Sequence, residues 1–263
     1  MVELATIEKE LILTQARLKL AGAAASDSDG ALPAGPGLTP AETVALLVAA
    51  NLFTSATLVC ETFGVPVSGV VEGLAGRAAR LSQARPAEQD QAWTWLAENN
   101  PGGAEIRGEC AVEAAWQLLQ HLVTEKERRG ETALHRAVVT RLFSLGCSLP
   151  PWLTAGYKKR DPAELMRMYH QHGRLEAAAE LAAEYITAVL GTGAEYFGLE
   201  GGLVAGGRPA WVPWRALDRL MLELRDNSGD QRIGESLQKL EKVVEKYLAT
   251  VERVSRDMVA SRA

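Results

Sequence analysis

Apolar residues recur at intervals of three and four positions along most of the chain, and β-branched residues seldom alternate with polar ones. The first pattern is typical of one buried face of an α-helix, whereas strict alternation is typical of a strand. The sequence therefore predicts an all-α protein. Helices are expected over residues 4–22, 39–50, 53–62, 68–81, 88–98, 109–128, 132–145, 151–160, 161–170, 175–190, 214–224 and 232–263.

One segment near the start interrupts this helical pattern. The run ASDSDGALPAGPG, residues 25–37, combines small, polar, glycine and proline residues, a composition typical of a flexible linker. Directly after it, Thr39, Pro40 and Glu42 fit a helix N-cap, a first helical position and a capping-box glutamate. We therefore expect an N-terminal helix over 1–24, a linker over 25–38 and a helical domain over 39–263.

Two joints between helices share one pattern. In LLVAANLFTSATLV a helix is expected to end at Asn51, and in MYHQHGRLEAAAEL another is expected to end at Gly173. Asn and Gly tolerate the positive φ that a helix C-terminus commonly requires. Apolar or small residues follow each joint at offsets of two, five and eight: Phe53, Ala56 and Val59 after the first, and Leu175, Ala178 and Leu181 after the second. Repeated joints of this kind predict stacked helical hairpins, that is, an irregular α-solenoid with a long C-terminal helix.

The C-terminal helix carries the most regular apolar pattern. Residues of this seam follow one another at alternating spacings of four and three: Ile233, Leu237, Leu240, Val244, Tyr247, Val251, Val254 and Met258. A repeat averaging about 3.5 keeps one stripe aligned along a helix, and such a stripe requires a second helix. Two interpretations stay open. The seam packs along the end of the chain's own solenoid, or it forms a partner surface or short coiled coil.

Composition and charge narrow the function classes. The chain has 263 residues, 47% of them hydrophobic and 23% charged, which is typical of a folded protein. Its net charge of −5 weakly repels phosphate backbones and anionic membrane surfaces, so no direct nucleic-acid contact is expected. The three cysteines lie far apart, and no apolar run reaches the length of a signal peptide or a membrane span. We expect an intracellular protein without membrane insertion.

The segment Ser148 to Ala182 contains the residues that most resemble a small active site. His170 and His172 are two positions apart, so on a helix their side chains diverge by about 200° and cannot share one metal ion. Lys158 belongs to a short basic run before Asp161, where cations complement a helix C-terminus. The Gly-x-Gly of GTGAEYFG follows a helix rather than a strand, which is the wrong context for a dinucleotide-binding turn. We therefore expect no catalytic, metal or cofactor site and no small-molecule substrate.

Several blocks of the sequence resemble one family. They are LILTQARLKLA near the start, ANLFTSATLVCETFGVPVSGVVEGLAGRAARL and AWTWLAEN, then LPPWLTAGYKKRDPAELMRMY, EYITAVLGTGAEYFGLE and WVPWRALDRLM. In this order they resemble the C-terminal helical region of the 160-kilodalton scaffold nucleoporins of the Y-shaped outer-ring complex of the nuclear pore.

The resemblance implies a non-enzymatic structural protein of the nuclear envelope. Its expected partners are other scaffold nucleoporins near the hub of the Y, and its expected role is to support nucleocytoplasmic transport and mRNA export. The family's β-propeller and much of its upstream helical region have no counterpart here, so we expect a fragment, an isoform or an incomplete gene model. The alternative is an α-helical adaptor that acts outside the pore.

The glycine-rich loop before the last two helices carries two tryptophans that fit the family block and are good hydrophobic anchors. Together with the seam they make up the predicted partner interface: Trp211, Trp214, Leu237, Leu240, Val244, Tyr247 and Val251.

Overall fold

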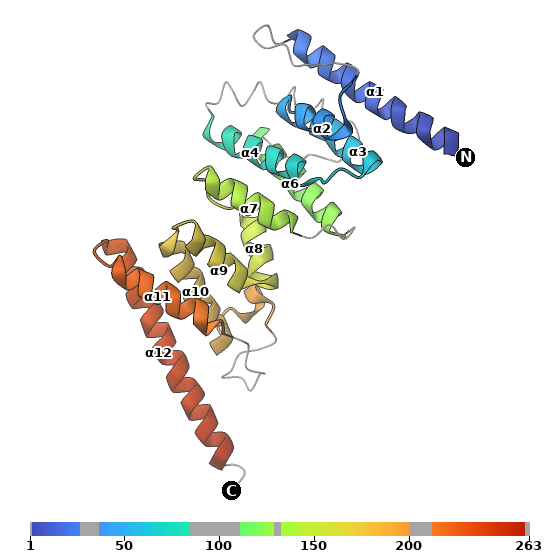
Figure 1. Cartoon of the computed structure of the whole chain (residues 1–263). Helices are drawn as coiled ribbons and strands as arrows, with labels where there is room; N and C mark the ends of the chain where they lie inside the picture. The colour runs from blue at the N-terminus through green and yellow to red at the C-terminus, as the bar shows by residue number, and fades with distance from the viewer. Residues whose placement is uncertain (1, 27–36, 85–110, 129–132, 200–211, 261–263) are drawn as a thin grey trace. The chain divides into compact units, whose positions relative to one another are not determined.

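The computed structural model describes residues 2–26, 37–84, 111–128, 133–199 and 212–260. These ranges form α-helices and one short 3-10 helix, and they contain no strand (Figure 1). The all-α prediction is therefore confirmed for the part of the chain that is described. The predicted helix over 88–98 and nearly all of the predicted linker lie outside it.

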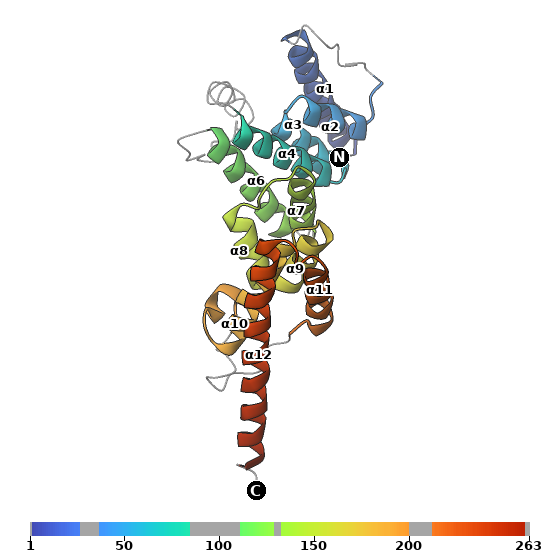
Figure 2. The ribbon, with the colours of Figure 1, turned by 90° about the vertical axis from the view of Figure 1, so that its left-hand side faces the viewer.

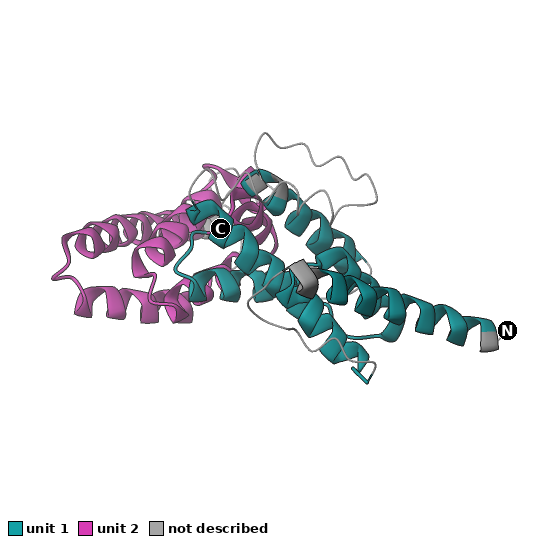
Figure 3. Cartoon of the chain, turned by 90° about the horizontal axis from the view of Figure 1, so that it is seen from above, with its two compact units in different colours: residues 1–148 teal, residues 149–263 magenta. Residues whose placement is uncertain are grey.

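The chain divides into two compact units, Met1–Ser148 and Leu149–Ala263 (Figure 3). The first unit contains α1 (Val2–Ser26), α2 (Pro40–Ala49), α3 (Phe53–Phe63), α4 (Ser68–Gln83), α6 (Ala111–Arg128) and α7 (Leu134–Ser144). The second contains α8 (Pro151–Arg160), α9 (Pro162–Gln171), α10 (Leu175–Leu190), the 3-10 helix η1 (Ala194–Phe197), α11 (Trp214–Asp226) and α12 (Gln231–Ala260). No local sequence feature had indicated a division at residue 148.

The first unit is organised around α4. This helix packs against α2, α3, α6 and α7, and α1 packs against α2 and α3. Gly73 explains how closely α4 approaches its neighbours, because an added Cβ there would overlap a methyl carbon of Val48 and lie 3.3 Å from a ring carbon of Phe53. The same helix contains Gly69, where an added Cβ would meet nothing within 4 Å. A side chain is therefore excluded at one glycine of α4 and tolerated at the other.

The start of α2 has the predicted capping box. The Glu42 amide donates to the Thr39 hydroxyl at 3.3 Å, and the Thr39 amide donates to a Glu42 carboxylate oxygen at 2.8 Å. Both bonds satisfy amide groups that have no partner within the helix. They also favour the ionised carboxylate, so the hydrogen bonds from Thr39 lower the pKa of Glu42.

The two predicted joints have the same local structure. Asn51 has φ +59° and Gly173 has φ +67°, and each ends its helix in the left-handed region. The next amide bonds back five residues in both cases, Leu52 to the Leu47 carbonyl at 2.8 Å and Arg174 to the Tyr169 carbonyl at 2.9 Å. These are Schellman-type closures, and they turn the chain into an antiparallel neighbour. The predicted helical hairpins α2–α3 and α9–α10 are thus confirmed, each within its own unit.

The second unit is organised around α10. Eleven of its sixteen residues are buried, five of them alanines, and it packs against α9, η1, α11 and α12. A helix that is apolar on most sides is buried on most sides, and alanine lets neighbouring backbones approach closely. The Tyr185 and Phe197 rings meet edge to face at 5.4 Å, fixing η1 against α10. The segment after residue 190, for which the sequence predicts no helix, therefore contains an additional helical turn. A turn of four residues is too short to show a periodic apolar pattern.

Candidate partner interface

The first half of the predicted seam on α12 belongs to the core of the second unit. Leu240 is fully buried, and Leu237 and Tyr247 are each 8% exposed, because α12 packs along α10 and α11. Val244, which lies between them, is partly exposed. Packing within the chain therefore accounts for the seam up to Tyr247, as the first of the two open interpretations expects.

The second half of the seam is only partly covered, because Val251 and Val254 are both partly exposed. From Leu248 to Arg256 no α12 side chain is buried, and Leu248 is 54% exposed. Figures 1 and 2 show α12 continuing past the other helices of its unit. We call the side chains of Leu248, Val251 and Val254 the open face of α12. The partner role of Val251 and of the other interface residues stays a prediction, but this half of the helix has room for a partner.

Trp214 connects α11 to α12. It is the first residue of α11, its side chain is 36% exposed, and its ring centroid lies 5.4 Å from that of Tyr247. Burial against this neighbourhood raises the pKa of the Tyr247 hydroxyl, because the charged phenolate is poorly solvated there. Trp214 thus packs on one side and remains accessible on the other. Trp211 lies outside the described residues.

The residues that resembled an active site have separate partners. Lys158 pairs with Glu184 of α10 and lies 5.7 Å from the Phe197 ring centroid, while His170 bonds Glu223 of α11. His172 is exposed where α9 ends. Since Lys158 faces α10 and His170 faces α11, these side chains do not assemble around one reacting atom.

Within the described ranges, no three His, Cys, Asp or Glu side chains are grouped so that they could hold a metal ion. None of the described helices combines the length and apolarity needed to cross a bilayer.

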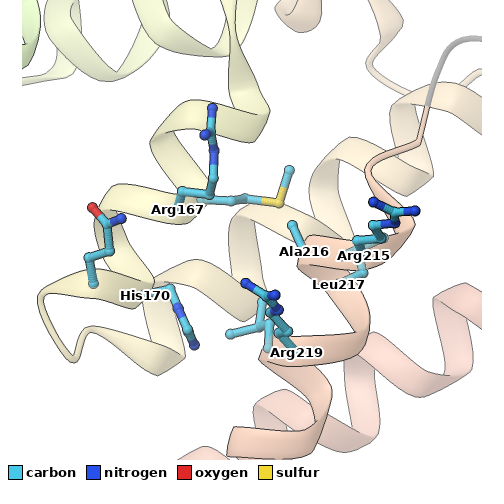
Figure 4. A pocket seen from close by; sticks show the side chains of 9 residues that line it. Arg167, His170, Arg215, Ala216, Leu217 and Arg219 are labelled. Carbon is cyan, nitrogen blue, oxygen red and sulfur yellow. The ribbon is translucent and has the colours of Figure 1, made fainter.

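A feature not found from the sequence is a hollow between α9 and α11. It has a volume of about 290 Å³, and its lining includes three arginines, Arg167, Arg215 and Arg219 (Figure 4). Arg215 and Arg219 are four residues apart on α11, a spacing that places two side chains on one helix face. The sequence alone could therefore have predicted that Arg215 and Arg219 lie on the same face. It could not have predicted Arg167 beside them, because that depends on the packing of α9 on α11.

The comparisons with known proteins decide the family. A family model described as the Nup160 C-terminal TPR matches residues 3–263. The chain belongs to this family. The resemblance noted in the sequence is thereby confirmed, and the pairwise stacking of α-helices in each unit fits a TPR-like helical region.

Curated relatives in the Nup160 family support the same assignment. The chain is 37% identical over 262 residues to "Nuclear pore complex protein Nup160" of Homo sapiens, which covers 99% of this chain and 18% of the relative. It is 31% identical over 223 residues to the Drosophila melanogaster Nup160 homolog, covering 84% of this chain and 16% of that protein. The chain therefore spans about a fifth of the length of the curated relatives that it matches.

Proposed function

We propose that this chain is a structural, non-enzymatic segment of the nuclear pore scaffold at the nuclear envelope. It assembles with other nucleoporins of the outer-ring Y-complex through helix–helix contacts, and so supports nucleocytoplasmic transport and mRNA export. The observation that carries the proposal is the family match over residues 3–263, together with 37% identity to the human nuclear pore complex protein.

The open face of α12 supplies a physical basis for assembly. Leu248, Val251 and Val254 present apolar carbon to solvent on a helix whose preceding turns are firmly packed. A stable contact buries roughly 1,200–2,000 Å² in total, with a few apolar anchors near its centre dominating the binding free energy. A partner helix packed on these three side chains would bury them, and the interface would be continuous with the core of the second unit. Trp214, partly exposed beside Tyr247, offers a further aromatic anchor.

The proposal is tested by affinity purification of the tagged chain at near-physiological salt, followed by mass spectrometry of the retained proteins. Recovery of outer-ring nucleoporins is expected. Val251→Arg should lower that recovery by about tenfold or more, because an interface anchor is worth about 1.4 kcal/mol or more. Ala249→Arg is the matched control, since Ala249 is exposed on the opposite side of the same helical turn. Equal recovery with both variants would remove the open face from the proposal.

The localisation is tested separately by tagging the endogenous chain. A rim pattern at the nuclear envelope is expected of a pore scaffold, whereas a diffuse signal would favour the adaptor that acts elsewhere. If the folded chain retains no outer-ring nucleoporin and shows no rim, the scaffold function is wrong.

A further inference from the structure

The hollow between α9 and α11 combines an apolar floor with a cationic rim. Met166, Leu217 and Leu220 form part of its lining and are each at most 3% exposed, so they give the hollow a fixed apolar base. The charged lining residues are basic, and no Asp or Glu lines this hollow. Figure 4 shows Arg167 and His170 extending from one helix and Arg215 and Arg219 from the other.

The basic residues of this rim differ in whether they have a partner within the described part of the chain. Arg167 pairs with Glu164 of its own helix, and His170 bonds Glu223. Arg215 and Arg219 are exposed, and within the described part of the chain neither guanidinium has an ion-pair or hydrogen-bond partner. This pair of basic side chains has the opposite sign to the net charge of the chain, which is −5. Like charges four residues apart on a helix repel each other, and an anionic group bound between them would relieve this repulsion.

The hollow continues toward Trp214. A second hollow of about 650 Å³ shares Arg167, Arg215 and Ala216 with the first and is also lined by Trp214. Its one acidic lining residue, Asp161, already accepts a hydrogen bond at 2.9 Å from the Glu164 amide as the cap of α9. Arg215 therefore lines both hollows, which together we call the arginine groove, whereas Arg219 lines only the first and Trp214 only the second.

The chemistry of the groove defines what fits it. Arginine binds carboxylates through two parallel hydrogen bonds, and each such pair is specific in geometry as well as charge. The apolar floor accepts an aliphatic or aromatic side chain of the same segment, and two hollows with shared lining residues can hold successive side chains of a short peptide. Duplex or single-stranded nucleic acid is disfavoured, since the rest of the chain is net acidic.

We propose that the arginine groove docks a short acidic segment of a partner protein, with Arg215 and Arg219 binding its carboxylates and Met166 and Leu220 receiving a neighbouring apolar side chain. The inference rests on the proposed function in one respect, namely that the segment comes from another nucleoporin of the same assembly. It uses a different surface from the open face of α12, so the two contacts can be tested independently.

The test is an array of overlapping short peptides that covers the other outer-ring nucleoporins, probed with the full chain. Each bound peptide is resynthesised with Glu and Asp replaced by Gln and Asn. Binding is then measured by fluorescence anisotropy. The expected result is that bound peptides are rich in Asp and Glu, and that the amide versions bind at least about tenfold more weakly.

The protein side of the test uses charge reversal. Arg215→Glu together with Arg219→Glu should weaken binding of the acidic peptides by at least about tenfold. Arg232→Glu with Arg253→Glu, two exposed arginines of α12, makes the same charge change elsewhere and should leave binding within about twofold. Circular dichroism confirms that both variants are folded. If the first variant is unfolded, Arg215→Gln with Arg219→Gln replaces it.

The remaining outcomes overturn the inference. They are an array without bound peptides, binding that ignores the amide replacement, and equal weakening by the control variant. If outer-ring nucleoporins copurify with the chain but no acidic peptide binds, the groove inference fails and the proposed function stands. If acidic peptides bind but the chain retains no outer-ring nucleoporin and shows no rim at the nuclear envelope, the scaffold function fails instead.

Discussion

Replacing Leu240 by alanine tests whether α12 is part of the core of the second unit. Leu240 is fully buried where α12 packs on α10, so the substitution removes three carbons from a close-packed site. At about 0.8 kcal/mol per buried methylene the transfer cost alone is about 2.4 kcal/mol. The cavity left behind brings the expected loss of unfolding free energy to about 3–5 kcal/mol.

Leu248→Ala is the matched control. It is the same substitution on the same helix two turns later, and it changes helix propensity by the same small amount. Because the Leu248 side chain is 54% exposed, its removal takes little area out of a packed environment, and the expected loss is below about 1 kcal/mol. The difference between the variants therefore measures packing rather than helix formation.

Hydrogen exchange followed by mass spectrometry suits a chain with two compact units, because it reports stability peptide by peptide. A loss of about 3 kcal/mol should accelerate exchange of protected amides in α10 and in the first half of α12 by about 150-fold. Leu248→Ala should change them by less than about fivefold. Similar acceleration by both variants, or little by either, would show that α12 does not pack on α10 as described.

Three further predictions concern local structure. Gly73→Ala should destabilise the first unit by about 1–3 kcal/mol in urea unfolding, because its Cβ overlaps a neighbouring helix, whereas Gly69→Ala on the same helix should be neutral or stabilising. Gly173→Ala should cost about 1–2 kcal/mol in the same assay, because its φ of +67° strains any residue with a Cβ; a change near zero would mean that the joint rearranges freely. Because the pKa of Glu42 is lowered, its capping interaction stabilises the fold at pH values above the ordinary pKa of a glutamate, and this stabilisation is lost as the pH falls through the lowered pKa. An NMR titration of Glu42 should show the lowered pKa. Thr39→Ala should return the pKa of Glu42 toward its ordinary range.

Features that depend on neighbours in sequence were predictable. The capping box at Thr39 and the joints at Asn51 and Gly173 arise from residues within a few positions of one another, so the sequence specifies them almost completely. The pattern of apolar residues likewise predicted every described α-helix, with ends that differ by a few residues. At these positions, residues close in sequence determine where a helix begins or ends.

Features that depend on which helices meet were not predictable. The seam pattern continues unchanged past Tyr247, yet the seam residues that are buried, Leu237, Leu240 and Tyr247, all lie in its first part. Nothing in the spacing of α12 predicts where this burial ends. Lys126 is 2% exposed and pairs with Glu61 at 2.5 Å across 65 positions of sequence. The arginine groove similarly requires α9 and α11 to pack together. Such sites depend on which helices pack together, and the spacing of apolar residues along each helix does not determine this.

The position of α12 in the sequence has a consequence for synthesis on the ribosome. About forty residues separate Leu190, where α10 ends, from Gln231, where α12 begins. At roughly 5–20 residues per second, α10 emerges some 2–8 s before the helix that covers it. During that interval its alanine-rich, otherwise buried surface is open to other nascent chains and to chaperones. A stop codon or a stalled ribosome between the two helices would therefore leave a chain in which the described helix with the most buried residues is exposed. Quality control should remove such chains faster than those that extend past Tyr247.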